Sequence, residues 1–564
     1  MKRAILWAAG LLAGIVAGCS PAQYARQADR DAYRTLGGTQ HFALGQKREF
    51  DVSYRPIGSA DGRAKGTLRV GEKVIPVTGD QVTKLTLAEC LTVALHNSRS
   101  YQTRKEGLYT AALALANSRR GWNFPLLGGG ADAEVNRTVV NRDGETNSAA
   151  AGAELTLTQQ LVHGGVLTLG LGADLVSDLL GWDSTSLGSL LSANFTQPLL
   201  RGAWRGLAYE QQYRVERDFV FTVLEFERFT QEFAVAILAE YYNVLQQRDQ
   251  LVNEKENIER LKDTLDVTKV LVAGGARSQI EQDEAQQNLL DSQVRLQTQQ
   301  QRYGNTLDRF KITLGLPIVA RMEVDYPDAL TALNEAGPKA VPVREEEALR
   351  VALIARPDAL RQAAGVRDAQ RDVEIATDNF LPQLDVTLGI DAAGTLPHEP
   401  TRVQLHRHTR SATASFDYQI DQTDNRDAYR NALLARDRAR RDWEQFVDEV
   451  RLGVRESYRS LEQSNNNYKI EQENLKIAKR RQKLAVLQQK EGEASARDVL
   501  RAEDALRNAQ NGVTGALIDY TTTRLQFLTT LGLIRVDTEG QIDERAKPLE
   551  FDGIRRRYPY VARP

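Results

Sequence analysis

Long runs of helix-favouring residues dominate the chain. Residues 207–273 contain neither glycine nor proline, and the same is true of residues 276–303. At 1.5 Å per residue the first run would extend about 100 Å as a helix, which is too long for a compact domain. Gly274 and Gly275 separate the two runs. The pattern therefore predicts a long helical hairpin, a coiled-coil-like rod with its tip near residues 274–278.

The same pattern occurs twice. Gly492 lies 217 residues after Gly275 (492 − 275 = 217), and the sequence TLGL occurs at 313–316 and again at 530–533. Identical residues recur at this offset without a gap, which indicates an internal repeat. A second hairpin is thus predicted, with its tip near residues 491–495. Matching pairs are Tyr241 and Tyr458, Glu254 and Glu471, Asn257 and Asn474, Ser278 and Ser495, Leu289 and Leu506, and Phe310 and Phe527.

Each repeat begins with a shorter helix. Thr86 and Glu89 have the spacing of a capping box at the start of the first one. Pro125 and Pro382 stand at the ends of the two corresponding helices. These prolines are 257 residues apart, so the first repeat carries 257 − 217 = 40 additional residues between its helices.

The segments between the helices change to a period of two. Apolar and polar residues alternate in 166–176, 385–391 and 411–420. Alternation predicts strands with one apolar and one polar face, which suits a soluble sandwich as well as a membrane barrel. We expect about four strands per chain. Because the smallest membrane barrels have about eight strands, several copies would then share one barrel, unless the 40 additional residues add strands.

The N-terminus is typical of an exported lipoprotein. Lys2 and Arg3 precede an apolar run from Ala4 to Gly18, shorter than the ~20 residues that span a bilayer, so the segment is predicted to be a signal peptide. The end of the run resembles a lipobox, which would make Cys19 the acylated first residue of the mature chain. An ordinary secretory signal with an incidental cysteine is the alternative. A lipid anchor favours the membrane barrel over the sandwich.

Composition excludes several classes of protein. The net charge is −2 and charged residues make up 26% of the chain, which argues against a bundle of membrane helices and against a nucleic-acid-binding protein. The only other cysteine, Cys90, lies on an apolar helical pattern and is interpreted as a small buried hydrophobe.

Catalytic motifs are not evident. The sequence shows no phosphate-binding loop, zinc-ligand spacing or nucleophile elbow, so we predict neither an enzyme nor a cofactor. His398, His406 and His408 could share a strand face and bind a metal, but an exposed loop is the favoured interpretation, and no metal site is predicted.

Over residues 85–540 the sequence resembles the TolC-like family of outer-membrane efflux proteins. The resemblance is carried by the duplicated helix–strand–helix unit, both TLGL ends, FTQPLLRG at 195–202 and GEASARDVLRAEDALRNAQ at 492–510. It implies a homotrimer that combines a β-barrel shared by the three chains with a periplasmic α-helical barrel built from the two repeats. It also implies docking to a periplasmic adaptor protein and an inner-membrane pump.

This resemblance predicts a mixed α/β membrane protein with a defined domain order. The barrel strands would lie at about 130–200 in the first repeat and about 383–421 in the second. The expected segments are a lipoprotein signal peptide at 1–18, an N-terminal tether at 19–84, a first repeat at 85–317, a second repeat at 343–534 and a C-terminal tail at 535–564.

The resemblance also implies roles for residues at the hairpin tips. Asp498 occupies the family's acidic position at the periplasmic entrance, where three carboxylates in a narrow pore would favour cations. Glu281 is its equivalent in the first repeat. Arg501 stands where the family often has a second acidic residue, so it would alter the entrance or pair with Asp498. The small residues predicted to let adaptor helices approach are Gly275, Ala276, Gly492 and Ala494.

Two functions follow from these patterns. The first is an exit duct in the outer membrane for an efflux or one-step secretion system, whose cargo the pump would select. The second is a lipid-anchored periplasmic rod or adaptor without a pore, with its strands in a soluble sandwich. For the tip residues, a solvated hairpin end is the corresponding alternative.

Overall fold

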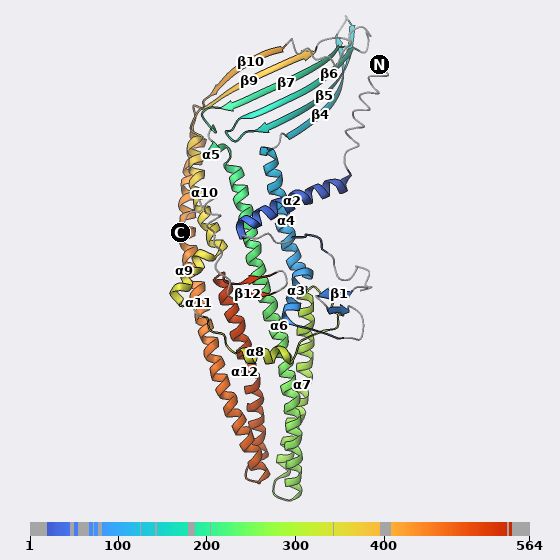
Figure 1. The fold of residues 1–564 in the computed structure, drawn as a ribbon, viewed down its shortest axis with the longest axis vertical. Coiled ribbons are helices and arrows are strands. Elements are labelled where there is room, and N and C mark those ends of the chain that lie inside the picture. Colours follow the sequence, from blue (N-terminus) through green and yellow to red (C-terminus); the bar gives the residue numbers. More distant parts are fainter. Residues whose placement is uncertain are drawn as a thin grey trace.

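The computed structural model shows an elongated molecule with a sheet at one end and two helical hairpins reaching the other (Figure 1). It describes residues 20–44, 50–54, 67–70, 73–76, 82–123, 126–140, 144–178, 186–203, 205–341, 343–394, 408–537 and 541–543. The predicted signal peptide, Cys19, His398, His406 and residues 544–564 of the tail lie outside the described residues.

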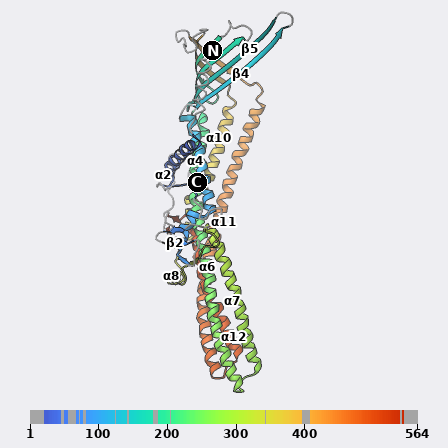
Figure 2. The same ribbon diagram turned by 90° about the vertical axis from the view of Figure 1, so that its right-hand side faces the viewer.

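Two pairs of very long helices form the rod. The first pair is α6 (Glu210–Ala273) and α7 (Gln279–Thr313), and the second is α11 (Thr423–Lys490) and α12 (Ala496–Thr530). The helices lie in the order α11, α12, α6, α7, each packed on the next (Figures 1 and 2). The glycine breaks in the sequence coincide with the two turns at the tips. None of the described helices is long and apolar enough to cross a bilayer.

Shorter helices lead from the middle of the molecule towards the sheet. In the first repeat they are α3 (Leu87–Asn97) and α4 (Arg99–Asn123), and in the second α9 (Glu345–Ala355) and α10 (Pro357–Asp378). The capping box predicted at the start of α3 is confirmed. The Thr86 backbone N–H donates to Glu89 Oε2 at 2.8 Å, and the Thr86 hydroxyl accepts from the Glu89 N–H.

The sheet has six antiparallel strands in the described part of the chain, in the order β10-β9-β7-β6-β5-β4. The prediction of about four strands is therefore wrong in number. The extra pair comes from the 40 additional residues, which are rich in glycine and alanine at 128–130 and 149–153 and so give little apolar alternation. The strands are β4 (Leu126–Val140), β5 (Gly144–Gln160), β6 (Val166–Asp178), β7 (Ser186–Pro198), β9 (Gln383–Gly394) and β10 (His408–Asp417).

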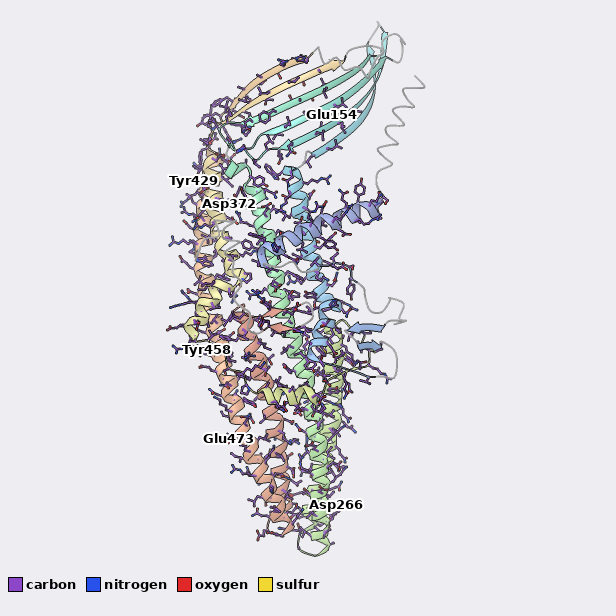
Figure 3. The ribbon with its side chains drawn as sticks, viewed as in Figure 1. Glu154, Asp266, Asp372, Tyr429, Tyr458 and Glu473 are labelled. Carbon is purple, nitrogen blue, oxygen red and sulfur yellow. The ribbon has the colours of Figure 1, made fainter. Side chains whose placement is uncertain are left out.

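One face of this sheet is apolar and uncovered. The register places Leu155 opposite Leu171 and Leu171 opposite Leu191, so apolar side chains align across the strands. Each of these three leucines is at least 38% exposed. Charged and hydroxyl side chains such as Glu154 (Figure 3) occupy the alternate positions. Exposed apolar area of this extent indicates contact with a partner or a lipid phase.

Smaller elements surround the middle of the molecule. Within the segment predicted as a tether, α2 (Pro21–Leu44) packs on α4 and α6, and it buries Ala32 and Leu36 among their apolar side chains. A parallel pair, β3 (Thr83–Leu85) and β8 (Met322–Val324), joins the two ends of the first repeat. The remaining elements are β1 (Thr67–Val70), β2 (Lys73–Pro76), α5 (Arg205–Ala208), α8 (Asp328–Ala336), β11 (Arg535–Val536) and β12 (Ile542–Asp543).

The glycine of the first TLGL segment is required by its surroundings. Gly315 has a φ of +77°, and a Cβ there would overlap the carbonyl of Asn97 and lie 2.9 Å from the backbone nitrogen of Ser98. We expect Gly315→Ala to lower the free energy of unfolding by about 2–4 kcal/mol, from left-handed strain plus overpacking. Denaturant titration followed by circular dichroism at 222 nm would measure the loss.

The second TLGL segment provides a matched control. Gly532 has a similar φ of +72°, but a Cβ there would lie 3.3 Å from the carbonyl oxygen of Ala355. Gly532→Ala should therefore cost only the backbone strain, about 1–2 kcal/mol. Equal losses in the two variants would contradict the proposed overlap with Asn97.

Candidate functional site

The two hairpin tips are built by the same turn. At each tip a residue just past the helix adopts a left-handed conformation, Gly275 with φ +73° and Gly492 with φ +78°. The Ala276 N–H donates to the Leu271 carbonyl at 2.9 Å, and the Glu493 N–H donates to the Gln488 carbonyl at 2.8 Å. This is the Schellman arrangement, which closes a helix and reverses the chain in a few residues.

Asp498 is positioned by the cap of α12. The Ser495 hydroxyl donates to Asp498 Oδ2 at 2.7 Å and the Ser495 backbone N–H donates to the same oxygen at 3.3 Å. These hydrogen bonds, aided by the charges of Arg501 and Arg277, hold the pKa of Asp498 below its ordinary value. The side chain is exposed and ionised, which is the state that a cation-selective entrance requires.

Arg277 ties the first tip to the second. Its Nη2 atom donates to the carbonyl oxygens of Gly492 and Ala494, both at 2.8 Å. Its guanidinium also lies 3.7 Å from Glu281, whose Oε2 atom accepts from the Ala496 N–H at 3.3 Å. Arg277 and Glu281 thus bind backbone groups that α12 and its turn leave unpaired.

A second link lies beside the first. Arg497 of α12 forms an ion pair with Glu284 of α7 that uses both carboxylate oxygens, with Nε 3.2 Å from Oε2. The positive charges of this link and of the Arg277 link come from different hairpins. Together they hold the two tips against each other.

Further from the tips, buried charges join the hairpins. Glu254 of α6 is fully buried, accepts a 2.5 Å hydrogen bond from Ser292 and lies 3.3 Å from Arg295 Nε and 3.6 Å from Arg507 of α12. Glu503 of α12, also buried, accepts from Arg260 of α6 at 2.7 Å. Since buried charges are costly unless paired, these contacts fix the register of one hairpin on the other.

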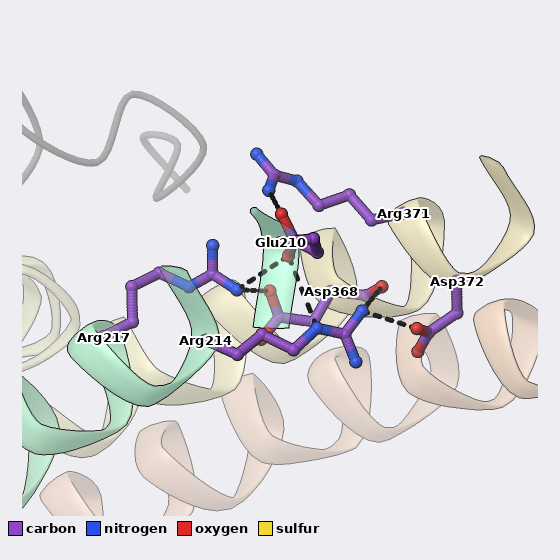
Figure 4. A network of polar contacts seen from close by, with 6 residues as sticks. All are labelled: Glu210, Arg214, Arg217, Asp368, Arg371 and Asp372. Carbon is purple, nitrogen blue, oxygen red and sulfur yellow. Dashed lines mark hydrogen bonds and ion pairs between the residues drawn. The ribbon is translucent and has the colours of Figure 1, made fainter. Parts of the chain in front are cut away.

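A third group of charges lies at the opposite end of the rod, between the first turns of α6 and the helix α10 (Figure 4). Glu210 is at its centre, only 3% exposed, and three arginines surround it. We call this group the collar. Its members are Glu210, Arg214 and Arg217 of α6 with Asp368, Arg371 and Asp372 of α10.

The predicted site residues lie together at the tips. Asp498 and Arg501 are exposed on α12, and Glu281 is partly buried between the hairpins. The small residues Gly275, Ala276 and Gly492 are exposed, whereas Ala494 is buried where Arg277 crosses. Sequence reasoning missed Arg277, Glu284 and Arg497. The only signal in the sequence was that both tips carry arginines and that the first tip also carries acids. Which arginine pairs with which acid could not be predicted, because the pairing exists only once the hairpins lie side by side.

Metal ligation has no support in the described residues, which contain no group of three or more candidate side chains able to hold an ion. His408 begins β10 on an exposed edge, and its Nε2 atom lies 3.0 Å from Arg410 Nε.

Comparisons with known proteins agree with this architecture. The family model of outer membrane efflux proteins matches residues 348–533, within the second repeat. The outer-membrane channel OprN has a TM-score of 0.58 at 14% identity, over 86% of this chain and 98% of OprN. The CmeC outer membrane channel of Campylobacter jejuni has a TM-score of 0.57 at 15% identity, over 84% and 89%. The MtrE outer membrane channel of Neisseria gonorrhoeae, solved in its open state, has a TM-score of 0.56 at 13% identity, over 83% and 98%. No curated protein matched the chain.

The architecture therefore defines a class, the bacterial outer-membrane channel fold in which a β-sheet domain continues into a rod of paired helical hairpins. The resemblance seen in the sequence is confirmed. The fold is that of the TolC-like channels, and residues 348–533 match the family model of outer membrane efflux proteins.

Proposed function

We propose that three copies of this chain form an exit duct in the outer membrane, through which cargo passes from an inner-membrane pump to the outside. The duct serves an efflux or one-step secretion system and binds a periplasmic adaptor at its hairpin tips, and Cys19 carries a lipid anchor. The observation that carries the proposal is the uncovered apolar face of the sheet. A soluble sandwich would bury that face, whereas a barrel wall presents it to lipid.

The outer helices support association of several copies. In the row α11, α12, α6, α7 the two end helices carry exposed apolar side chains at helical spacing. On α7 they include Leu290 and Val294, four residues apart, and on α11 they include Ile470, Ile477 and Leu484, seven residues apart. Such stripes are the contact surfaces of coiled coils. Pairing α7 of one copy with α11 of the next closes the rods into a tube.

The tips form the periplasmic end of this tube. In a trimer three copies of Asp498 surround the axis, so the entrance attracts cations. The links made by Arg277 and Arg497 hold each second hairpin against the first and keep the entrance narrow. Transport in this arrangement needs no chemistry from the duct.

Current through a planar bilayer tests the proposal directly. The purified protein should give steady, discrete, cation-selective openings. Protein that stays monomeric and dissolves without detergent after removal of its lipid would overturn the duct and favour the periplasmic rod. A folded trimer without current would indicate a sealed tip, and the Arg277 variant described in the Discussion should then conduct.

Asp498 makes a specific prediction for this measurement. Asp498→Asn should reduce cation selectivity and weaken block by divalent cations. Because the pKa of Asp498 lies below the ordinary 3.8, the selectivity of the unaltered protein should persist as pH falls to 3.8 and disappear only below it. Asp266→Asn is the control, since Asp266 is exposed near the first tip (Figure 3) and pairs within its own helix with Lys269. Equal selectivity in the two variants would remove Asp498 from the pore.

A further inference from the structure

We propose that the barrel has eighteen strands, six from each of three copies (3 × 6 = 18), with β4 of one copy hydrogen-bonded to β10 of the next. The inference rests on the proposed trimeric duct and extends it, because it fixes the joint between copies and the width of the exit. Within the six-stranded sheet, as far as the structure describes it, β4 and β10 are the two edge strands, each with a neighbour on one side only. Backbone groups on such edges need partners inside a bilayer.

The additional strands β4 and β5 place apolar and polar residues on the same two faces as the other strands of the sheet. Following the register from β4 to β9, apolar residues stand opposite one another on one face. Glycine and polar residues stand opposite one another on the other face. The apolar row is Leu127, Leu157, Leu169, Ala193 and Ile390, and the polar row is Gly128, Thr156, Gly170, Ser192 and Asp391. A hairpin that projected into water would need no apolar face continuous with the wall, so β4 and β5 belong to the wall.

Strand direction permits the joint. Every neighbouring pair in the order β10-β9-β7-β6-β5-β4 is antiparallel. With an even number of strands, β4 and β10 run in opposite directions, so β4 of one copy meets β10 of the next in the antiparallel arrangement found throughout the sheet. The alternation of strand direction therefore continues around the whole closed barrel.

The width of the helical part fits six strands per copy better than four. Below the sheet the helices lie in the order α11, α10, α6, α4, and these helices lead into or out of β10, β9, β7 and β4. Four helices at about 9 Å spacing cover an arc of about 36 Å. Strands 4.8 Å apart and tilted by about 40° each cover about 6.3 Å of circumference, so six cover about 38 Å and four only about 25 Å. Six strands match the helices beneath them.

This joint gives the duct a wide exit. Barrels of 16–18 strands leave an aqueous channel, in contrast to barrels of about eight strands, whose side chains fill the interior. The polar face, with Thr156, Ser192 and Asp391 in register, would line that channel with groups that hold water. The barrel is then as wide as the helical tube, and the tips alone limit the size of the hydrated cargo.

Cysteine cross-linking in the outer membrane tests which strand forms the edge. Leu127 and Phe416 lie on β4 and β10 at the ends nearest the helices. Within one copy these strands are five steps apart, about 24 Å, which a short bis-maleimide cannot span. In a Cys90→Ala background, the pair Leu127→Cys and Phe416→Cys should therefore give covalent dimers and trimers on a denaturing gel. Phe416→Ala with Leu127→Cys is the matched control and should stay monomeric on that gel.

A rival pair separates the outcomes. Leu167→Cys on β6 with Phe416→Cys should give no cross-linked trimer if β4 is the edge. If this pair links and the Leu127 pair does not, β6 is the edge, the wall has twelve strands, and the inference fails while the trimeric duct stands. If neither pair links, the strand count in an electron cryo-microscopy map of the trimer decides, eighteen supporting the inference and twelve overturning it. A monomeric, water-soluble protein would overturn the duct and the inference together.

Discussion

Replacement of Arg277 by alanine should open the periplasmic end of the duct. The variant loses two 2.8 Å hydrogen bonds to the second tip, at Gly492 and Ala494, and the contact with Glu281. A hydrogen bond from a charged donor contributes about 1.5–3 kcal/mol when buried. Because Arg277 is 20% exposed, we take about 2 kcal/mol for both bonds together. The ratio of open to closed tips in each copy should then rise about 30-fold.

Single-channel recording in planar bilayers would detect this change as a larger conductance or a higher open probability. Lys269→Ala is the matched control, since it removes a cation near the same tip that pairs only within α6, with Asp266. Arg277→Lys should show an intermediate effect, because an ammonium group keeps the charge but loses the fork that reaches two carbonyls. Unchanged currents in Arg277→Ala would show that the link to the second tip does not control the entrance.

The double variant of Arg277→Ala and Arg497→Ala extends the argument. Arg497 forms the other link, with Glu284, and it comes from the opposite hairpin. Because the two links join the same pair of tips, formation of one link favours formation of the other. We therefore expect their effects on the open population to be non-additive, as is usual for neighbouring contacts.

The sequence predicts the rod well and the sheet less well. Glycine-free runs, the 217-residue offset and both TLGL segments specify two hairpins, because a helix tens of residues long leaves a pattern that few other structures share. The strands at 166–176 and 385–391 alternate clearly. In 126–160 glycine and alanine replace the large apolar residues, so a wall strand there looks like a polar linker. Length was the better signal: the 40 additional residues suffice for one hairpin.

The tip residues show a different limit. Asp498 follows Ser495 by three positions, so its capping role can be recognised from spacing alone. Arg277 binds carbonyl oxygens 215 and 217 residues away, and nothing in a local pattern specifies such a partner. Charges that act within one element are thus accessible from sequence, whereas links between elements require the packing of the hairpins.

Loss of one charge from the collar should destabilise the molecule strongly. Glu210 is 3% exposed and contacts Arg214 at 3.4 Å, Arg217 at 3.3 Å and also Arg371. Glu210→Gln removes the negative charge that neutralises these three arginines in a buried environment. Removing one partner of a buried ion pair costs about 3–5 kcal/mol, and we expect a loss of that size in the free energy of unfolding. Denaturant titration of the purified protein, followed by circular dichroism, would measure it.

Two further variants show whether the collar acts as a network. Glu232→Gln is the exposed control on the same helix. Glu232 is 50% exposed and pairs with Arg228 one turn away, so its loss should cost less than about 1 kcal/mol. Arg371→Gln combined with Glu210→Gln should lose less stability than the sum of the two single changes, because both changes remove the same contact between Arg371 and Glu210. Strict additivity, or equal losses for Glu210→Gln and Glu232→Gln, would mean that α6 and α10 are held together by apolar packing and that the charges of the collar contribute little.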